Sequence, residues 1–451
     1  MPTPPDPQAP GSTDEAPRWV FFLLATAVAL LAANLYYAQP LVGLIARDFG
    51  TSTATSGLVV TCTQLGYVVA LVLVVPLGDL VENRRLGVSV TALAVVGLTM
   101  ATFVTGLAWF MAASLLIGLG SVAVQIFVPF ASHLASEANR GRALGTVTSG
   151  LMLGVMLARP VSSLLAETGS WHIVFGAAAV VMLALMATLH RVLPTRHPAE
   201  GIHYGQLLAS MPRLVRTTPL LRRRTVYQSA LFGSFSLFWT VTPLYLSRHF
   251  GFGQGEIAAF ALAGVAGAVA APIAGRVADR GWTRPATGIG LTLALTAFVL
   301  PFLAPAGSTA ALVLLTVSAV ILDFGVTGNL TMGQRALFSL GTEQRSRLNG
   351  VFMTTFYLGG AAGSALGADL YTSGGLPAAA TLAGTVLALT AVYYLTEFRS
   401  RAAQLTVPRM PTASRAVAGS AGVREPLPTR DQRGTLAQVT ADRDKIKDAS
   451  G

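Results

Sequence analysis

Long apolar segments recur from near the start of the chain almost to its end. Each is close to the roughly 20 residues that a helix needs to cross the hydrocarbon core of a bilayer. Only 11% of the residues are charged, whereas ordinary soluble domains carry about 25%. The sequence therefore predicts an all-α polytopic membrane protein, because helices satisfy their own backbone hydrogen bonds in lipid.

We expect about twelve spans, in two sets of six separated by a polar stretch. They lie at residues 19–41, 57–77, 87–106, 109–133, 143–166 and 171–193, then at 225–247, 256–278, 285–304, 309–332, 348–371 and 377–397. The expected organisation is a disordered N-terminus (1–17), an N-terminal six-helix bundle (18–193), a basic linker (194–223), a C-terminal six-helix bundle (224–398) and a disordered tail (399–451).

The net charge of +11 does not indicate a nucleic-acid partner, because the arginines lie between apolar segments and not on one face or tail. Most of them fall on alternate loops. The positive-inside rule places these loops, the linker and both termini in the cytoplasm of a plasma (inner) membrane protein. Cys62 is the only cysteine, and no phosphate-binding G-x-x-x-x-G-K-[ST] loop occurs. The sequence therefore predicts no metal, no cofactor and no ATP-driven step.

The two halves of the chain contain a repeat. Residues 140–145 (RGRALG) match residues 345–350 (RSRLNG) at an offset of 205, and Gly154 matches Gly359 at the same offset. Two halves in the same orientation are typical of transporters whose site lies between the halves, near the bilayer midplane.

The loop after the second span of each half carries a more specific motif. In the second half, Gly275, Asp279, Arg280, Gly281 and Arg284 resemble the G-x-x-x-D-R-x-G-R-R loop of the major facilitator superfamily. The first half has a shortened version, PLGDLVENRR. The resemblance covers about residues 18–398. It implies two pseudo-symmetric six-helix bundles that enclose a central cavity and move by alternating access.

Two further stretches, NLYYAQP (34–40) and RSRLN (345–349), are similar to a bacterial branch of sugar or drug efflux permeases. The fifth span resembles the drug:proton antiporter signature G-x8-G-x3-G-P. Gly145 and Gly154 fit that signature, whereas Ala158 replaces the third glycine and Arg159 displaces the proline to Pro160.

The charged side chains of the two loops are candidates for a conformational latch that holds one state by charge pairing and releases in the other. The alternative is an ordinary loop that only sets topology. The candidates are Asp79, Glu82, Arg84, Arg85, Asp279 and Arg280.

Arg159 lies inside the fifth span. An arginine there costs about 2.5–3.5 kcal/mol on insertion scales, so it usually faces a protein interior or a water-filled cavity. We expect it to meet an anionic substrate group or a buried carboxylate. The alternative is a snorkelling side chain that reaches the outer interface.

Asp323 is the only carboxylate well inside a predicted span. In a water-filled cavity such a group can exchange a proton, which is what proton coupling requires. The alternative is a structural partner for the backbone or for Arg335. A direct pair between Asp323 and Arg159 is left open, because their depths in the membrane can differ.

Polar and aromatic residues of several spans complete the candidate substrate cavity. In a regular helix Asn34 and Tyr37 share a face, and Tyr36 lies off it unless Pro40 distorts the helix. For each residue alone, packing between helices is the alternative. With Arg159, the cavity candidates are Asn34, Tyr37, Gln39, Gln64, Gln125, Trp239 and Tyr357.

These features favour a secondary active transporter that exports a small amphipathic or sugar-like solute against inward proton flow. Proton-coupled uptake and a non-transporting membrane sensor are the alternatives. An enzyme is not expected, because no cluster of catalytic His, Asp or Glu lies at one depth. The expected partners are a small-molecule substrate, protons and the lipid bilayer, with the chain working as a monomer.

Overall fold

The computed structural model describes residues 17–137, 139–195, 204–340 and 345–405. The chain divides into two units, residues 1–397 and 398–451. The expected N-terminal segment, except Pro17, and the tail from residue 406 lie outside the described residues. Residues 399–405, placed in the tail by the sequence, belong to a helix.

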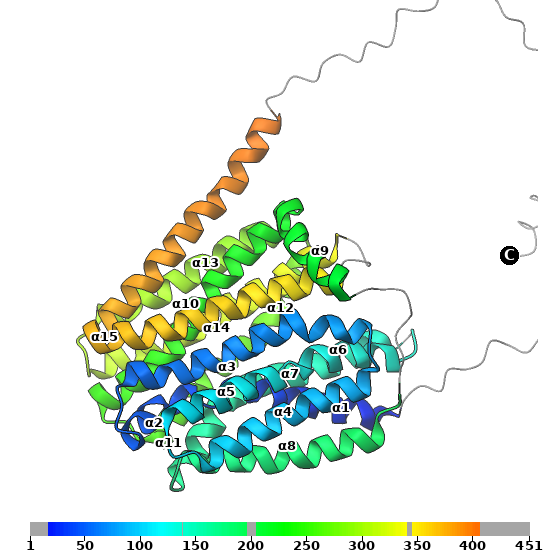
Figure 1. The fold of residues 1–451 in the computed structure, drawn as a ribbon. Helices are drawn as coiled ribbons and strands as arrows, with labels where there is room; N and C mark the ends of the chain where they lie inside the picture. The colour runs from blue at the N-terminus through cyan, green and yellow to red at the C-terminus, as the bar shows by residue number, and fades with distance from the viewer. Residues whose placement is uncertain (1–16, 138, 196–203, 341–344, 406–451) are drawn as a thin grey trace, which may run out of the picture. The chain divides into compact units, whose positions relative to one another are not determined.

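The helices of the first half run from blue to blue-green in Figure 1, and short turns interrupt some of them. The elements are α1 (Arg18–Ala33), η1 (Gln39–Leu41), α2 (Val42–Asp48), α3 (Thr53–Leu73), η2 (Val75–Asp79), α4 (Asn83–Phe103), α5 (Leu107–Ser121), α6 (Ala123–Leu134), α7 (Arg140–Glu167) and α8 (His172–Val192).

The second half follows a linker helix, α9 (Tyr204–Thr217). It is built from α10 (Pro219–Phe250), α11 (Gln254–Ala261), η3 (Leu262–Ala266), α12 (Gly267–Asp279), α13 (Thr283–Val299), η4 (Leu300–Leu303), α14 (Thr309–Phe338) and α15 (Arg345–Leu405).

The predicted fold class is confirmed. Among the described residues, ten helices are long and apolar enough to cross a membrane, and the 16-residue α1 is a shorter apolar helix. α15 changes direction at Gly375, where φ is 65°, a value that favours glycine. It therefore supplies two spans, which we call its first arm (before Gly375) and its second arm (after it). Ten helices, α1 and the extra arm make twelve spans.

α1 stops well before its expected end. After Ala33 the backbone tightens: the Leu35 N–H donates to the Ala32 carbonyl at 3.2 Å and the Tyr36 N–H to the Ala33 carbonyl at 2.9 Å. Pro40, which has no N–H to donate, lies in the following turn η1. This break is the distortion that changes the direction of Tyr36.

Small residues bring the helices of each half into close contact. In the first half, a Cβ at Gly150 or Gly154 would collide with the backbone of α1 at Ala25 or Ala29. In the second half, Gly359 and Gly363 of α15 meet the backbone of α10 in the same way. Both halves therefore pack their first and fifth spans by the same small-residue contact, in keeping with the repeat.

The linker contains an amphipathic helix, α9, which the sequence did not indicate because arginines interrupt its apolar residues. Leu207 and Leu214 of α9 are buried, one helical repeat of seven apart. The Tyr204 hydroxyl donates to the Leu73 carbonyl at the end of α3, at 2.6 Å. Met211 lines a small pocket with residues of η2 and α15. α9 thus contacts both halves of the chain.

Candidate functional site

Arg159 points into the protein and is only 2% exposed. Its Nε donates to Gln39 Oε1 at 2.7 Å. Its guanidinium carbon lies 5.0 Å from the ring centroid of Tyr36, 4.9 Å from that of Phe235 and 4.4 Å from that of Trp239. Two of these rings belong to α10, so the arginine of the first half is held against the second half by cation–π contact.

Asp323 lies in the middle of α14 and is 4% exposed. Its Oδ1 accepts a hydrogen bond of 2.9 Å from Nε1 of Trp239. The indole of Trp239 therefore contacts both side chains: Arg159 lies over its ring, and Asp323 accepts a hydrogen bond from its N–H. No ion pair within 4.0 Å joins the described side chains of Arg159 and Asp323.

The alternative partner for Asp323 lies elsewhere. Nη1 of Arg335 donates to the Gly275 carbonyl at 3.0 Å and pairs with Asp279. Arg335 thus joins the ends of α12 and α14 and does not contact the buried carboxylate.

Gly264 packs directly against the Asp323 carboxylate. The sequence did not indicate this contact. Gly264 lies in η3, the interruption between α11 and α12. A Cβ at this position would be 2.7 Å from Asp323 Oδ2 and 3.0 Å from Cζ2 of Trp239. Only a residue without a side chain fits here unless Asp323 or Trp239 moves.

The other cavity candidates surround a group of aromatic rings between the two halves. Nε2 of Gln64 donates to the Ser236 hydroxyl at 2.9 Å, which joins α3 to α10. Nε2 of Gln125 donates to the Tyr67 hydroxyl at 3.1 Å. The ring of Tyr67 in turn lies 4.3 Å from that of Tyr357 on α15, measured between centroids.

Several amides in this region have no partner for part of their hydrogen-bonding capacity. Asn34 is 3% exposed, and neither Oδ1 nor Nδ2 of its amide has a hydrogen-bond partner among the described residues. The same holds for Nε2 of Gln39, Oε1 of Gln64 and Nη2 of Arg159. A buried polar group without a partner costs about 1–3 kcal/mol. Donors and acceptors of this kind, beside aromatic rings, suit a ligand with both polar and apolar surface.

Tyr37 is buried at 7% exposure. Because the helix breaks after Ala33, the ring that contacts Arg159 is that of Tyr36.

The sequence did not indicate three residues of α10 that lie at this site: Phe232, Phe235 and Ser236. In the stretch 232–239 (FGSFSLFW) the large apolar residues fall on several sides of a helix, so helical periodicity indicates no single inward face. The spacing of Phe235 and Trp239, four residues apart, is the signal that was available.

The loop residues of the first half cap and anchor α4. Glu82 accepts from the backbone N–H groups of Arg84 at 2.9 Å and Arg85 at 3.1 Å. Arg84 Nη1 donates to the Leu193 carbonyl after α8 at 3.0 Å. Among the described side chains, these contacts and the Asp279–Arg335 pair each stay within one half. Arg280 is exposed, and the side chain of Asp79 lies outside what the structure describes.

The sequence profile of the Major Facilitator Superfamily matches residues 22–339. The chain belongs to this superfamily. It is 39% identical over 368 residues to the uncharacterized transporter YgaY of Escherichia coli O157:H7, a match that covers 81% of this chain and 92% of that protein. It is also 29% identical over 255 residues to the chloramphenicol efflux pump Rv0191 of Mycobacterium tuberculosis, covering 54% of this chain and 60% of the pump.

A solved structure of the nucleoside transporter NupG superposes with a TM-score of 0.68 at 12% identity, covering 84% of this chain and 100% of that one. The superfamily fold thus extends over most of the chain. This superfamily member is a secondary transporter of small molecules and not an enzyme, and it crosses the membrane many times.

Proposed function

We propose that this transporter exports a small amphipathic or sugar-like solute across the plasma membrane in exchange for protons. In this proposal Asp323 is the group that takes up and releases the proton. Arg159 is the buried positive charge that ionised Asp323 compensates. The observation that carries the proposal is the placement of one buried guanidinium and one buried carboxylate on the same indole, Trp239, between the two halves.

The coupling follows from charge compensation. A charge that is buried in protein without compensation is costly. While Asp323 is ionised, it compensates Arg159 through space. When Asp323 takes a proton, the guanidinium loses this compensation and favours a substrate group that accepts hydrogen bonds or carries negative charge. Proton and substrate thus both change how the charge of Arg159 is compensated. Each can therefore bind one conformation of the carrier more tightly than the other.

The substrate class follows from the lining. Tyr36, Phe235 and Tyr357 offer ring faces, and the unpaired amides of Asn34 and Gln39 offer donors and acceptors. A compact solute with a ring or apolar face and several hydroxyl or amide groups fits these contacts. The similarity to a chloramphenicol efflux pump supports export of such a solute.

The moving bodies in this proposal are the bundles 18–193 and 224–398, with the linker 194–223 and both termini in the cytoplasm. Asn34, Tyr37, Gln39, Gln64, Gln125, Arg159, Trp239 and Tyr357 are the proposed substrate contacts. The loop residues, with the Asp279–Arg335 pair, act as the conformational latch, and one chain in the bilayer is the working unit.

The test uses everted membrane vesicles energised by an acidic interior, with radiolabelled chloramphenicol as the first probe and nucleosides as the second. We expect accumulation by the parent protein and its loss in Asp323→Asn, with chloramphenicol binding retained. Asp369→Asn, at an exposed position of α15, is the matched control. Unchanged accumulation in Asp323→Asn contradicts the coupling role, and accumulation only with the opposite gradient indicates uptake.

A further inference from the structure

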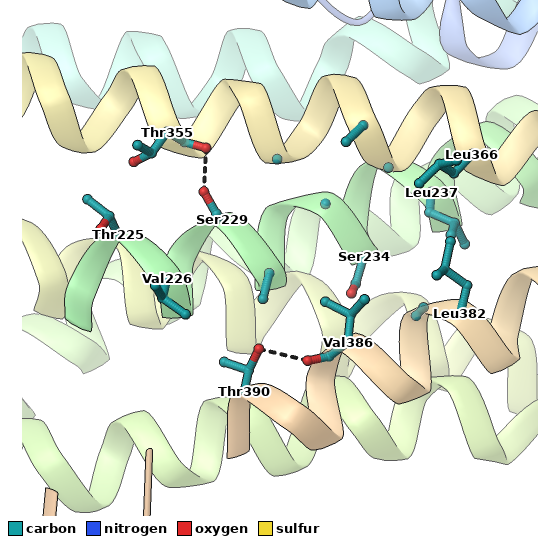
Figure 2. Close-up of a pocket in the computed structure, with 16 residues that line it drawn as sticks. Thr225, Val226, Ser229, Ser234, Leu237, Thr355, Leu366, Leu382, Val386 and Thr390 are labelled. Carbon is teal, nitrogen blue, oxygen red and sulfur yellow. Dashed lines mark hydrogen bonds between the residues drawn. The ribbon is translucent and has the colours of Figure 1, made fainter. Parts of the chain in front are cut away.

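A groove opens on the second half, where α10 forms the floor and the two arms of α15 form the walls (Figure 2). Its volume is about 450 Å³. Ala230 and Gly233 lie on the floor, and Leu366 and Val386 lie on opposite walls. Leu366 is 48% exposed and Val386 37%, so the groove is open along its side.

Most polar side chains along this groove bond to the backbone, and the buried hydroxyl of Ser234 has no partner among the described residues. The Ser229 hydroxyl donates to the Thr355 carbonyl, and the Thr390 hydroxyl donates to the Val386 carbonyl at 2.7 Å (Figure 2). What remains accessible is mostly methyl and methylene surface, which suits an alkyl chain.

The length of the groove matches one leaflet. It extends along α10 from Thr225 to Leu237. Twelve residues of α-helix rise about 18 Å, and half of the hydrocarbon core of a bilayer is about 15 Å thick. Because the groove begins near the start of α10, it lies in the leaflet that the positive-inside rule places at the cytoplasm.

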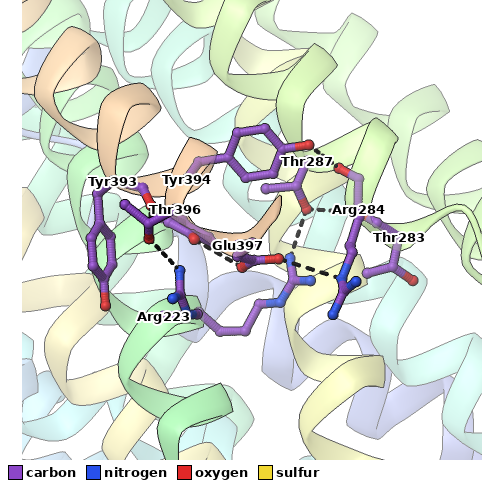
Figure 3. A network of polar contacts seen from close by, with 10 residues as sticks. Arg223, Thr283, Arg284, Thr287, Tyr393, Tyr394, Thr396 and Glu397 are labelled. Carbon is purple, nitrogen blue, oxygen red and sulfur yellow. Dashed lines mark hydrogen bonds and ion pairs between the residues drawn. The ribbon is translucent and has the colours of Figure 1, made fainter. Parts of the chain in front are cut away.

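Arginines lie at the end of the groove where α10 begins. Arg223 lies two residues before Thr225, where the groove begins. Its Nη1 donates to the Thr396 hydroxyl at 2.9 Å, and its guanidinium carbon lies 5.2 Å from the ring centroid of Tyr393 (Figure 3). The neighbouring Arg222 is exposed. Two arginines therefore lie at this end of the groove: Arg222 is exposed, and Arg223 is held against Thr396 and Tyr393.

The carboxylate near this end of the groove, Glu397, already has partners within the protein. Glu397 is 6% exposed, accepts from the Tyr227 hydroxyl at 2.8 Å and pairs with Arg284 at 3.5 Å. Arg224 is buried, and its Nη1 donates to the Thr287 hydroxyl at 2.6 Å. Within this network of described residues, one carboxylate therefore faces several guanidinium groups, and positive charge is in excess.

We propose that the groove binds an acyl chain of an anionic phospholipid from the cytoplasmic leaflet, with the headgroup phosphate at Arg222 and Arg223. The apolar groove receives the chain, its length matches one leaflet, and the arginines at the end where α10 begins select negative charge. The second arm of α15 then packs against α10 through lipid over this stretch.

Native mass spectrometry of the full chain in detergent tests this assignment, with added phosphatidylglycerol competing against phosphatidylcholine of the same chain length. We expect preferential retention of phosphatidylglycerol by the parent. Arg223→Gln should lower this preference about fivefold, as for one arginine at an anionic membrane surface. The matched control is Arg191→Gln, at an exposed position near the end of α8.

A second variant tests the groove itself. Ala362 lines it from the first arm and is exposed, so Ala362→Trp fills the space without disturbing a buried contact. We expect it to reduce retention of both lipids, whereas Leu389→Trp, at a position 66% exposed that is not among the lining residues, leaves retention unchanged. The proposal is overturned if Arg223→Gln retains the parent preference, if Ala362→Trp retains both lipids, or if glycerol phosphate alone displaces the bound phosphatidylglycerol.

Discussion

Trp239 donates a hydrogen bond of 2.9 Å from its indole Nε1 to Oδ1 of Asp323. The same indole carries the guanidinium of Arg159 at 4.4 Å from a ring centroid. One side chain of α10 therefore contacts a charge from each of two other helices, α7 and α14. The proposed transport cycle depends on this arrangement, and it supplies the sharpest tests.

Trp239→Phe separates the two functions of the indole. The phenyl ring still offers a face to Arg159, whereas the donor to Asp323 is lost. A hydrogen bond to a charged group contributes about 1.5–3 kcal/mol, so we expect proton-driven transport to fall by about tenfold or more in folded protein. Trp282→Phe, at a position 65% exposed, is the control. Parent-like rates in Trp239→Phe would show that the hydrogen bond has no role in coupling.

Arg159→Ala leaves the Asp323 carboxylate buried without its compensating charge. We expect lower stability, measured as a lower melting temperature, because the carboxylate must then stay buried without compensation or take up a proton. The double variant Arg159→Ala with Asp323→Ala should recover much of that stability and still fail to transport. If the double variant loses the sum of the two single effects, the two residues are not coupled.

Arg159→Lys retains the positive charge but not the planar guanidinium that bonds Gln39 while stacking on aromatic rings. We expect impaired transport in protein of nearly parental stability. Normal transport in this variant would mean that a charge alone is sufficient at position 159.

Gly264→Ala places a methyl group against Asp323 Oδ2 and the ring of Trp239. The carboxylate or the indole must move, so we expect a clear loss of proton-driven transport with normal insertion into the membrane. Gly145→Ala is the matched control, because nothing lies within 4 Å of a Cβ there. Equal activity of the two variants would contradict the close fit at Asp323.

The latch proposal predicts a kinetic effect. Asp279 and Arg335 are 67% and 47% exposed, so breaking their pair should cost about 1 kcal/mol of stability or less. We expect Arg335→Gln to change the transport rate and to leave substrate affinity unchanged. The exchanged pair Asp279→Arg with Arg335→Asp should recover part of the rate. An effect on affinity alone would assign these residues to the substrate pathway.

The twelve spans were predictable from the sequence because the bilayer imposes a length and an apolar composition on each of them. The repeat was predictable for a similar reason, since RGRALG and RSRLNG occupy equivalent turns. Pro40 indicated a distortion of the first span, but nothing in the sequence placed the end of α1 as early as Ala33, because the point at which the backbone breaks depends on what packs beside it. The apolar face of α9 was not predicted, because Arg213 and Arg216 lie among its apolar residues.

For the candidate site, the sequence by itself determined that Arg159 and Asp323 require partners, because an isolated charge inside a membrane protein is costly. Only the tertiary structure decided which partners they have. Arg159 and Asp323 are 164 positions apart, and the residue that contacts both, Trp239, lies between them on a third helix. Charge and hydropathy set the need for compensation; helix packing sets which side chain provides it.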